Sequence, residues 1–237
     1  MDPFELNRHI ERCERCPRLR EHCRQTAESP RAAFRGQRYW GRPVPNLLPE
    51  DPALETRLLL LGLAPAAHGA NRTGRMFTGD RSGDFLFAAM HAAGLCNQPT
   101  ATHAGDGLEL RGCAITAAAH CAPPANKPTA EELRRCSSHL ADAFEALPRL
   151  RAVVTLGRIA HDALLRLSKS CGGLATLKDA PFVHGQRYRL QLEVAGQTGT
   201  LAIHCTYHPS QQNTFTGRLT PVMLERVLTA AKRDAEL

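Results

Sequence analysis

Two polar loops in this sequence carry side chains that suit chemistry on a phosphorylated ligand. The first spans residues 62–80, contains Arg72 and Arg75 among several glycines, and ends on the carboxylate of Asp80. Glycines let a backbone approach a ligand closely, and arginine forks match phosphate geometry. The glycine spacing matches neither a Walker loop nor the dinucleotide fingerprint. Taken alone, this loop predicts a site for a nucleotide phosphate without identifying the nucleotide.

The second loop spans residues 207–220 and begins beside a histidine. His208 leaves the end of an apolar run and is followed by Pro209, Ser210 and a polar stretch that reaches a helix start. A lone histidine is usually a structural residue with a hydrogen-bond partner. At the carboxyl end of a strand, however, a histidine is well placed to exchange protons or donate hydrogen bonds to a ligand. We therefore interpret His208 as a candidate catalytic residue.

Nine cysteines are a third chemical signal. Cys13 and Cys16 form a CxxC pair, which in a reducing compartment needs two further soft ligands to hold a metal. From the residues alone zinc is the first candidate, and several of the other cysteines are typical of a packed core. Residues 1–5 lack the basic flank and apolar run of a signal peptide, so we expect a cytoplasmic protein with reduced thiols.

Charge and composition narrow the class of partner. The chain has 237 residues, a formal net charge of +7 and a sequence pI of about 9.1, which favours polyanions such as nucleic acid. Hydrophobic residues make up 43%, as in a globular protein. The longest nearly apolar run, residues 58–67, is too short to span a bilayer, which excludes a membrane-spanning reading.

The elements that position these loops are predicted from apolar runs. Short uninterrupted apolar runs predict strands at residues 58–63, 113–117, 152–156 and 201–205. Such runs indicate a sheet buried on both faces and therefore largely parallel. Helices are expected between and after them, at residues 80–94, 129–144, 157–167 and from Thr220 onward. The fold class is therefore a three-layer α/β/α domain with a central, largely parallel four-stranded sheet.

One domain is expected over residues 1–237. Residues 56–237 would form the α/β core, and residues 1–55 an N-terminal covering segment that is helical to about residue 25 with a break at Pro17. In this arrangement the polar loops all follow the carboxyl ends of strands, where open parallel sheets bind their ligands. The layout alone therefore predicts where the site lies.

The two loops together resemble the signature motifs of the uracil-DNA glycosylase superfamily. The first begins Gly62-Leu63-Ala64-Pro65 and ends Met76-Phe77-Thr78-Gly79-Asp80, and the second begins His208-Pro209-Ser210. The sequence of the first loop is similar to that of the iron–sulfur type-b branch, also called family 5. The resemblance runs from Cys13 to the last helix.

The resemblance implies a [4Fe–4S] cluster as a structural staple. The positions that match the cluster ligands are Cys13, Cys16, Cys121 and Cys136. Zinc stays open as the alternative metal, and Cys136 by itself is also typical of a core residue. The remaining cysteines match no ligand position and are expected to be structural: Cys23, Cys96, Cys113, Cys171 and Cys205.

The resemblance also implies roles at the reaction centre. His208 would contact the oxygen of the departing base, Asp80 would stabilise the sugar cation and orient water, and Asn126 would read the base edge or hold that water. Phe77 would stack on the flipped base, although it could instead be a residue of the packed core. Asp80 is equally suited to cap the following helix.

The implied contacts to substrate and DNA come from both loops, with residues 211–218 entering the minor groove. They are Gly62, Ala64, Pro65, Phe77, Arg72, Arg75, Ser210, Asn213 and Arg218. The three arginines are expected on phosphates, although each also fits a solvated surface charge.

Two alanines set this chain apart from the better-known branches of that superfamily. Ala64 and Ala117 stand where those branches place an Asp or Asn that positions water, so this task would pass to Asp80 or Asn126. Fewer obligatory hydrogen bonds reject wrong bases less sharply. We expect a broad substrate range: uracil, hydroxymethyluracil, hypoxanthine and xanthine in duplex DNA.

The expected enzyme is a monofunctional DNA glycosylase that acts as a monomer, since no lysine stands out as a nucleophile. Two alternatives remain open at this point. One is a DNA-damage-binding protein of the same fold with little catalytic activity, which the two alanines favour. The other is a cytosolic, zinc-stapled protein that binds a free nucleotide through the first loop.

Overall fold

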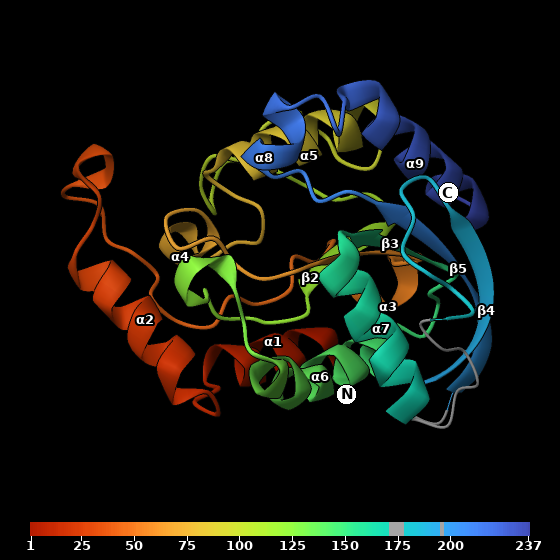
Figure 1. The fold of residues 1–237 in the computed structure, drawn as a ribbon, viewed down its shortest axis with the longest axis horizontal. Coiled ribbons are helices and arrows are strands. Elements are labelled where there is room, and N and C mark those ends of the chain that lie inside the picture. Colours follow the sequence, from red (N-terminus) through yellow and green to blue (C-terminus); the bar gives the residue numbers. More distant parts are fainter. Residues whose placement is uncertain (171–177, 195–196) are drawn as a thin grey trace.

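A central sheet organises the fold in the computed structural model, which describes residues 1–170, 178–194 and 197–237. The strand order is β2-β1-β3-β5-β4 (Figure 1). The bounds are β1 Leu58–Gly62, β2 Cys113–Ala117, β3 Ala152–Leu156, β4 Arg187–Val194 and β5 Gln197–Thr206. β1 pairs in parallel with β2 and β3, and β3 pairs in parallel with β5. The predicted largely parallel sheet is therefore confirmed, with one more strand than expected.

The additional strand is β4, which pairs antiparallel with β5 at the edge of the sheet. Its sequence, RYRLQLEV, alternates polar and apolar residues. That pattern is typical of an edge strand with one face in water, whereas the prediction relied on uninterrupted apolar runs. The fifth strand was missed for this reason.

The two faces of the sheet bury different helices. Leu58 and Leu60 of β1 pack into one hydrophobic cluster with residues of α5 (Arg81–Ala92) and α9 (Pro221–Asp234). Leu59 and Leu61 pack into the other cluster with residues of α6 (Ala130–Ala146) and α7 (Arg158–Ser170). Alternate side chains of a strand point to opposite faces, so this division confirms the predicted three layers.

Helix starts agree with the local sequence signals. The side chain of Thr129 accepts from the backbone of Glu132, whose carboxylate in turn accepts from the Thr129 backbone, which completes the capping box of α6. Thr220 caps α9 in front of Pro221, and Asp80 caps α5. These caps place the first turns of α5 and α9 directly after the two polar loops.

The N-terminal segment lies against this core. α1 (Pro3–Glu11) and α2 (Pro17–Glu28) are separate helices, as the break at Pro17 predicts. α1 packs on α6 through Leu6 and Ile10. The shorter elements are η1 Ala32–Phe34, α3 Pro52–Glu55, α4 Ala70–Thr73, η2 Pro124–Asn126 and α8 Gln211–Phe215. Among the described residues, no helix has the length and apolar character needed to cross a membrane.

Candidate active site at the carboxyl edge of the sheet

A cavity of about 510 Å³ lies where β1, β3 and β5 end. Because these strands are parallel, their carboxyl ends meet at one edge and bring their following loops together. The cavity is lined by residues after each of the three strands, including Leu63, Gly157, His208, Asn213 and Arg218. Its size falls within the roughly 300–1,000 Å³ of small-molecule sites. A cavity therefore lies at the predicted location of the site.

His208 lines this cavity in an environment that keeps its side chain neutral. Burial lowers the pKa of His208 to about 4, so the imidazole is uncharged at neutral pH. The Asn213 side chain donates from Nδ2 to the His208 carbonyl over 2.9 Å. Gly157, with φ +97°, passes close beneath: a Cβ there would lie 3.2 Å from Cβ of His208. The loop is therefore held from both sides while the imidazole ring lines the cavity.

Phe77 lies beside His208, with ring centroids 5.9 Å apart and planes at 31°. Two glycines make room for it. A Cβ at Gly62 would lie 2.9 Å from the Phe77 ring, and a Cβ at Gly83 would lie 1.8 Å from its carbonyl oxygen. Phe77 itself has φ +52°, a left-handed conformation that is uncommon outside glycine. The chain bends here so that the aromatic ring is carried over the end of β1.

Of the two roles expected of Asp80, the structure shows the helix cap. Its Oδ1 accepts from the Gly83 backbone N over 3.0 Å, which confirms the helix cap. Its Oδ2 lies against Gly69, where a Cβ would be only 2.0 Å away. Burial raises the pKa of Asp80 above its ordinary value, although backbone hydrogen bonds from Gly83 and Ser82 oppose the shift. Asp80 is not among the residues that line the cavity.

Arg72, expected on a DNA phosphate, is instead bonded inside the protein. It donates to the carbonyl of His68 at 2.9 Å, to the carbonyl of Gly79 at 2.8 Å and to Oε1 of Gln37 at 2.8 Å. Its guanidinium also sits 4.1 Å from the centre of the Phe34 ring. Through these contacts the guanidinium group holds the first loop together. The expectation that Arg72 contacts a phosphate is therefore corrected.

Arg75 needs the same correction. Its side chain is buried and forms an ion pair with Asp106 at 2.7 Å, and its Nε donates to Oγ1 of Thr78 at 2.9 Å. Burial by itself would raise the pKa of Asp106, but the Arg75 hydrogen bond and backbone donors hold it well below its usual range. The pair ties the first loop to the segment before β2. A phosphate cannot reach a guanidinium enclosed in this way.

The second loop presents its polar residues outward. Arg218 lines the cavity and is exposed, with its guanidinium 4.4 Å from the Tyr207 ring centre. Ser210 occupies the N-cap position of α8 and is half-buried. Phe215, on α8, is 69% exposed, which is unusual for a large apolar side chain. Sequence reasoning missed Phe215, although an aromatic residue inside so polar a loop was a signal.

Other lining residues were also missed. Phe182 and His184 come from the segment before β4 and line the cavity beside Tyr207. The His184 and Tyr207 rings stack at 4.7 Å, and His184 accepts from the Tyr207 backbone N over 3.2 Å. The segment carries no motif, so only the edge strand β4, which brings it to β5, reveals its place in the site.

Five further positions singled out from the sequence lie around this centre in different ways. Gly62 ends β1, and Ala64 and Pro65 follow it, with Pro65 buried. Asn126 ends η2 with φ +56°, is exposed, and is not among the residues that line the cavity. Its role in holding water stays a prediction. Ala117 is buried opposite Gly62 in the register of β1 and β2.

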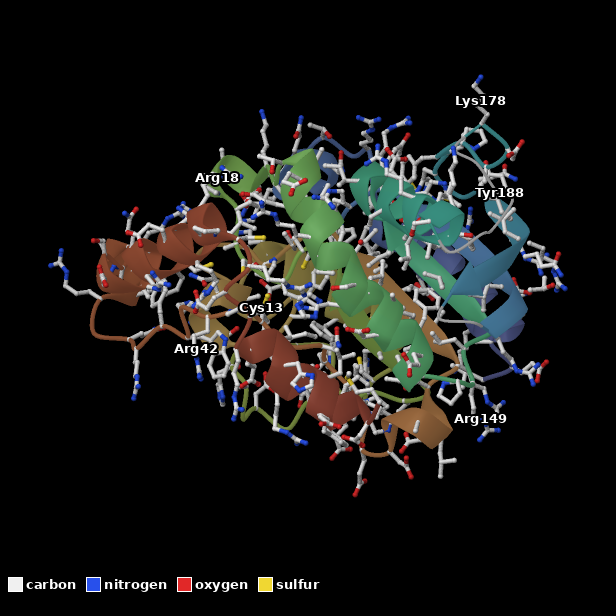
Figure 2. The ribbon with its side chains drawn as sticks, turned by 90° about the horizontal axis from the view of Figure 1, so that it is seen from below. Cys13, Arg18, Arg42, Arg149, Lys178 and Tyr188 are labelled. Carbon is white, nitrogen blue, oxygen red and sulfur yellow. The ribbon has the colours of Figure 1, made fainter. Side chains whose placement is uncertain are left out.

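A second cavity gathers the four candidate cysteines. Cys13, Cys16, Cys121 and Cys136 all line it, although they come from the α1–α2 junction, the loop after β2 and α6. Arg15, His120, Arg135 and His139 complete the lining among others. Arg15 donates from Nε to Sγ of Cys13 over 3.3 Å. Figure 2 shows Cys13 between the N-terminal helices and the body of the molecule.

Four soft thiol donors around one cavity, with cations beside them, suit an iron–sulfur cluster held by thiolates. Within the described part of the chain, no three His, Cys, Asp or Glu side chains converge as ligands of a single metal ion. Cys23, Cys96, Cys113 and Cys205 are buried as expected of core residues, whereas Cys171 lies outside the described residues.

Comparison with known proteins adds independent findings. A family model described as "Uracil DNA glycosylase superfamily" matches residues 49–232. A protein named "Type-5 uracil-DNA glycosylase" from Mycobacterium leprae is 48% identical over 232 residues, covering 98% of this chain and 95% of the relative. A protein of the same name from Thermus thermophilus is 46% identical over 240 residues and covers both chains completely. Another from Pyrobaculum aerophilum is 46% identical over 223 residues, 94% of this chain and 89% of the relative.

Proposed function

Because this chain belongs to the uracil DNA glycosylase superfamily, we propose that it hydrolyses the N-glycosidic bond of uracil in DNA and leaves an abasic site for base-excision repair. The observation that carries the proposal is the neutral, half-buried His208 at the mouth of a base-sized cavity with the Phe77 ring beside it. An aromatic face and a hydrogen-bond donor are what a flipped base requires.

His208 supplies the donor. Cleavage of the glycosidic bond leaves negative charge on the departing base, so a hydrogen bond to the base oxygen is stronger in the transition state than in the ground state. A neutral imidazole donates this bond without leaving a charged group buried in the cavity. Removing one such donor typically lowers the rate by about a hundredfold or more.

Asp80 supplies the negative charge that the sugar needs. Positive charge develops on the sugar as the bond breaks, and a carboxylate can both stabilise it and accept a proton from the attacking water. Oδ1 is occupied by the helix cap, so Oδ2 is the oxygen left for this task. Asn126 is exposed on the loop after β2 and would reach the water from the DNA side once DNA is bound.

The proposed substrate range includes hydroxymethyluracil, hypoxanthine and xanthine. The support is the lack of a hydrogen-bonding side chain at two positions that, by the family resemblance, hold water in other branches. Ala64 and Ala117 carry no hydrogen-bonding side chain, and Leu63, Leu156 and Phe182 give the cavity apolar walls. A pocket of this kind discriminates against isosteres by only about a hundredfold.

Two exposed residues on the second loop support a role in DNA contact. Arg218 is free to meet a phosphate at the rim of the cavity. Phe215 projects from α8 and would fill the space in the duplex that the flipped base leaves. Double-stranded DNA is the proposed partner, and the monomeric state and cytoplasmic location stay predictions.

The proposed cofactor is a [4Fe–4S] cluster held by Cys13, Cys16, Cys121 and Cys136, with zinc as the alternative. When bound, the cluster supplies cross-linking rather than redox chemistry, because its ligands join the N-terminal helices to α6 and the loop after β2. Anaerobically purified protein should contain about four iron and four sulfide ions per chain, as expected of such a cluster. Stoichiometric zinc without iron would overturn this assignment.

The activity is tested by a single-turnover assay on duplexes that contain one uracil, one hypoxanthine or only normal bases. Strand breaks that appear only after alkali, and only at the altered base, would support a monofunctional glycosylase and rank its substrates. Release of uracil alone would contradict the proposed broad range of substrate bases. Tight binding to damaged duplex without any base release would instead favour the damage-binding alternative that the two alanines suggest.

A further inference from the structure

Residues 31–42 form a basic hook that follows α2, and we call this segment the arginine arm. It contains Arg31, Arg35, Arg38 and Arg42, and the stretch from residue 29 to residue 49 contains no Asp or Glu. All four arginines are exposed. In Figure 1 the arm projects at the edge of the molecule next to α4, which places it beside the first loop. Figure 2 shows Arg42 at the α2 end, opposite Arg149 and Lys178.

The arm is anchored to the first loop by backbone bonds. The Trp40 backbone N donates to the Arg72 carbonyl over 2.9 Å, and the Gly41 backbone N donates to the Asn71 carbonyl over 3.0 Å. Gly74, with φ +75°, packs under the Trp40 ring, where a Cβ would come within 2.9 Å. The arm is therefore held in a set position beside the loop that ends at Asp80.

Side chains reinforce this anchor. Arg72 joins Gln37 and the Phe34 ring of the arm to the Gly79 carbonyl, which immediately precedes Asp80. Tyr39 Oη lies 3.0 Å from Nδ1 of His68 in the same loop. Since the arm and the loop share these contacts, cations on the arm have a defined placement relative to the site.

The arginine arm concentrates four arginines in a stretch of sequence without acidic residues. Some exposed arginines elsewhere pair with carboxylates, as Arg18 does with Glu132, Arg24 with Glu14, and Arg151 with Glu236. Over the residues that the structure describes, Arg31, Arg35 and Arg38 have neither an ion pair nor a hydrogen bond from their side chains. A row of unpaired like charges repels itself, and a polyanion relieves that repulsion.

The aromatic rings of the arm point to the kind of polyanion. Trp40 is covered by the Arg42 guanidinium at 3.9 Å, and Phe34 is covered by that of Arg72 at 4.1 Å. Proteins that bind single strands need open aromatic faces on which bases stack. Here these faces hold arginines in place, which favours contacts to the backbone of a duplex over contacts to bases.

We propose that the arginine arm is a second DNA-binding site, in which Arg31, Arg35 and Arg38 contact phosphates of the duplex to one side of the flipped nucleotide. This inference rests on the proposed function for the identity of the polyanion. The arm adds affinity along the duplex without reading sequence, and the base-flipping cavity carries the selection of the damaged base.

The test is the salt dependence of binding to a lesion-free duplex between about 50 and 200 mM salt. Each phosphate contact contributes roughly 0.9 to the slope of log K against log salt, so R31A/R35A/R38A should flatten that slope by about 2.7. The matched control is R8A/R166A/K169A, which removes the same charge from exposed cations on α1 and α7 and should leave the slope nearly unchanged. R31K/R35K/R38K should retain the wild-type slope, because lysine still contacts phosphate as a point charge.

Shortening a uracil-containing duplex from one end and then from the other locates the contact. On one side only, truncation should remove the difference in affinity between the wild type and the alanine variant. The single-turnover rate constant at saturating enzyme should agree within about twofold between them, because the arm does not touch the base. R31Q/R35Q/R38Q serves as a second variant should the alanine variant fail to fold.

The outcomes separate the two proposals. If the alanine and control variants flatten the slope equally, the arm contacts no phosphates and the inference is overturned. If the wild type releases uracil but the alanine variant binds DNA with the wild-type salt dependence, only this inference fails. If binding depends on the arm and no base is released, the proposed function fails and the arm still stands as a duplex-binding site.

Discussion

At the scale of single residues, the two groups proposed to act in the reaction have pKa shifts in opposite directions. His208 is neutral because burial lowers its pKa to about 4, whereas burial raises the pKa of Asp80 above its ordinary value. Shifted pKa values of titratable groups are common at functional sites. The remaining question at this scale is whether Asp80 is needed for its charge or only for its cap.

Replacing Asp80 by Asn separates these roles. Asn caps helices about as well as Asp, so D80N should change the free energy of unfolding by only a few tenths of a kcal/mol, whereas D80A should cost about 1 kcal/mol. Both should lower the single-turnover rate by about a hundredfold or more, because both remove the carboxylate. Urea unfolding and the alkali-cleavage assay measure the two quantities. A fully active D80N would confine Asp80 to the helix cap.

The pH dependence tests the same carboxylate. In the proposed mechanism Asp80 acts as the anion, so the rate should fall as pH drops through its pKa, which lies above the ordinary 3.8. His208 stays neutral down to about pH 4, so it adds no break between neutral pH and that point. Single-turnover rates measured over this range should therefore show one acidic limb in the wild type. In D80N the fall in rate at acidic pH should vanish. If it persists, another group than Asp80 causes it.

At the scale of elements, the first loop is shaped by internal bonds of its arginines. The Arg75–Asp106 pair joins the loop between β1 and α5 to the segment before β2, and both side chains are less than a tenth exposed. Removing one member of a buried pair leaves an uncompensated charge, which typically costs about 3–5 kcal/mol. The pair therefore stabilises the loop that carries Phe77 and Asp80.

A double-mutant cycle tests this role. R75M should lower the free energy of unfolding by about 3 kcal/mol or more, because Asp106 stays buried and charged. Adding D106N should recover part of that loss, so that the two changes together cost less than the sum of the single changes. Denaturant unfolding of the four proteins gives the coupling. Strict additivity would show that the two groups act independently.

At the scale of the whole molecule, the N-terminal segment depends on contacts distant in sequence. α1 packs on α6, the arginine arm packs on the first loop, and four cysteines from three parts of the chain line one cavity. A cluster at that cavity would cross-link all three parts. Its loss should release the N-terminal segment while the sheet and its two hydrophobic clusters remain folded.

Replacing Cys16 tests the cross-link, with Cys113 of β2 as the matched control. C16S should lose most of its iron and lower Tm by at least about 4 °C, as expected for a loss of roughly 2 kcal/mol in a chain of this size. Limited proteolysis should then cut first within residues 1–45. C113A changes a buried cysteine that is assigned no ligand role and packs in the core beside the sheet, so its iron content should stay at the wild-type level. Equal iron loss in both variants would make the ligand assignment wrong.

The sequence by itself determined the core of the fold and the location of the site. Uninterrupted apolar runs marked the parallel strands, because a strand buried on both faces has no polar position. Thr129 and Thr220 marked helix starts through local hydrogen bonds. The two polar loops followed the strand ends, and parallel strands then required these loops to meet at one edge.

Only the tertiary structure decided which partners the polar side chains take. Arg72 and Arg75 look like phosphate ligands in sequence, yet Gly79 and Asp106 engage them inside the protein. Phe182 and His184 join the cavity through an edge strand whose alternating pattern was overlooked. The physical reason is common to these cases: apolar periodicity and caps are local properties, whereas the partner of a charge depends on which distant segment folds beside it.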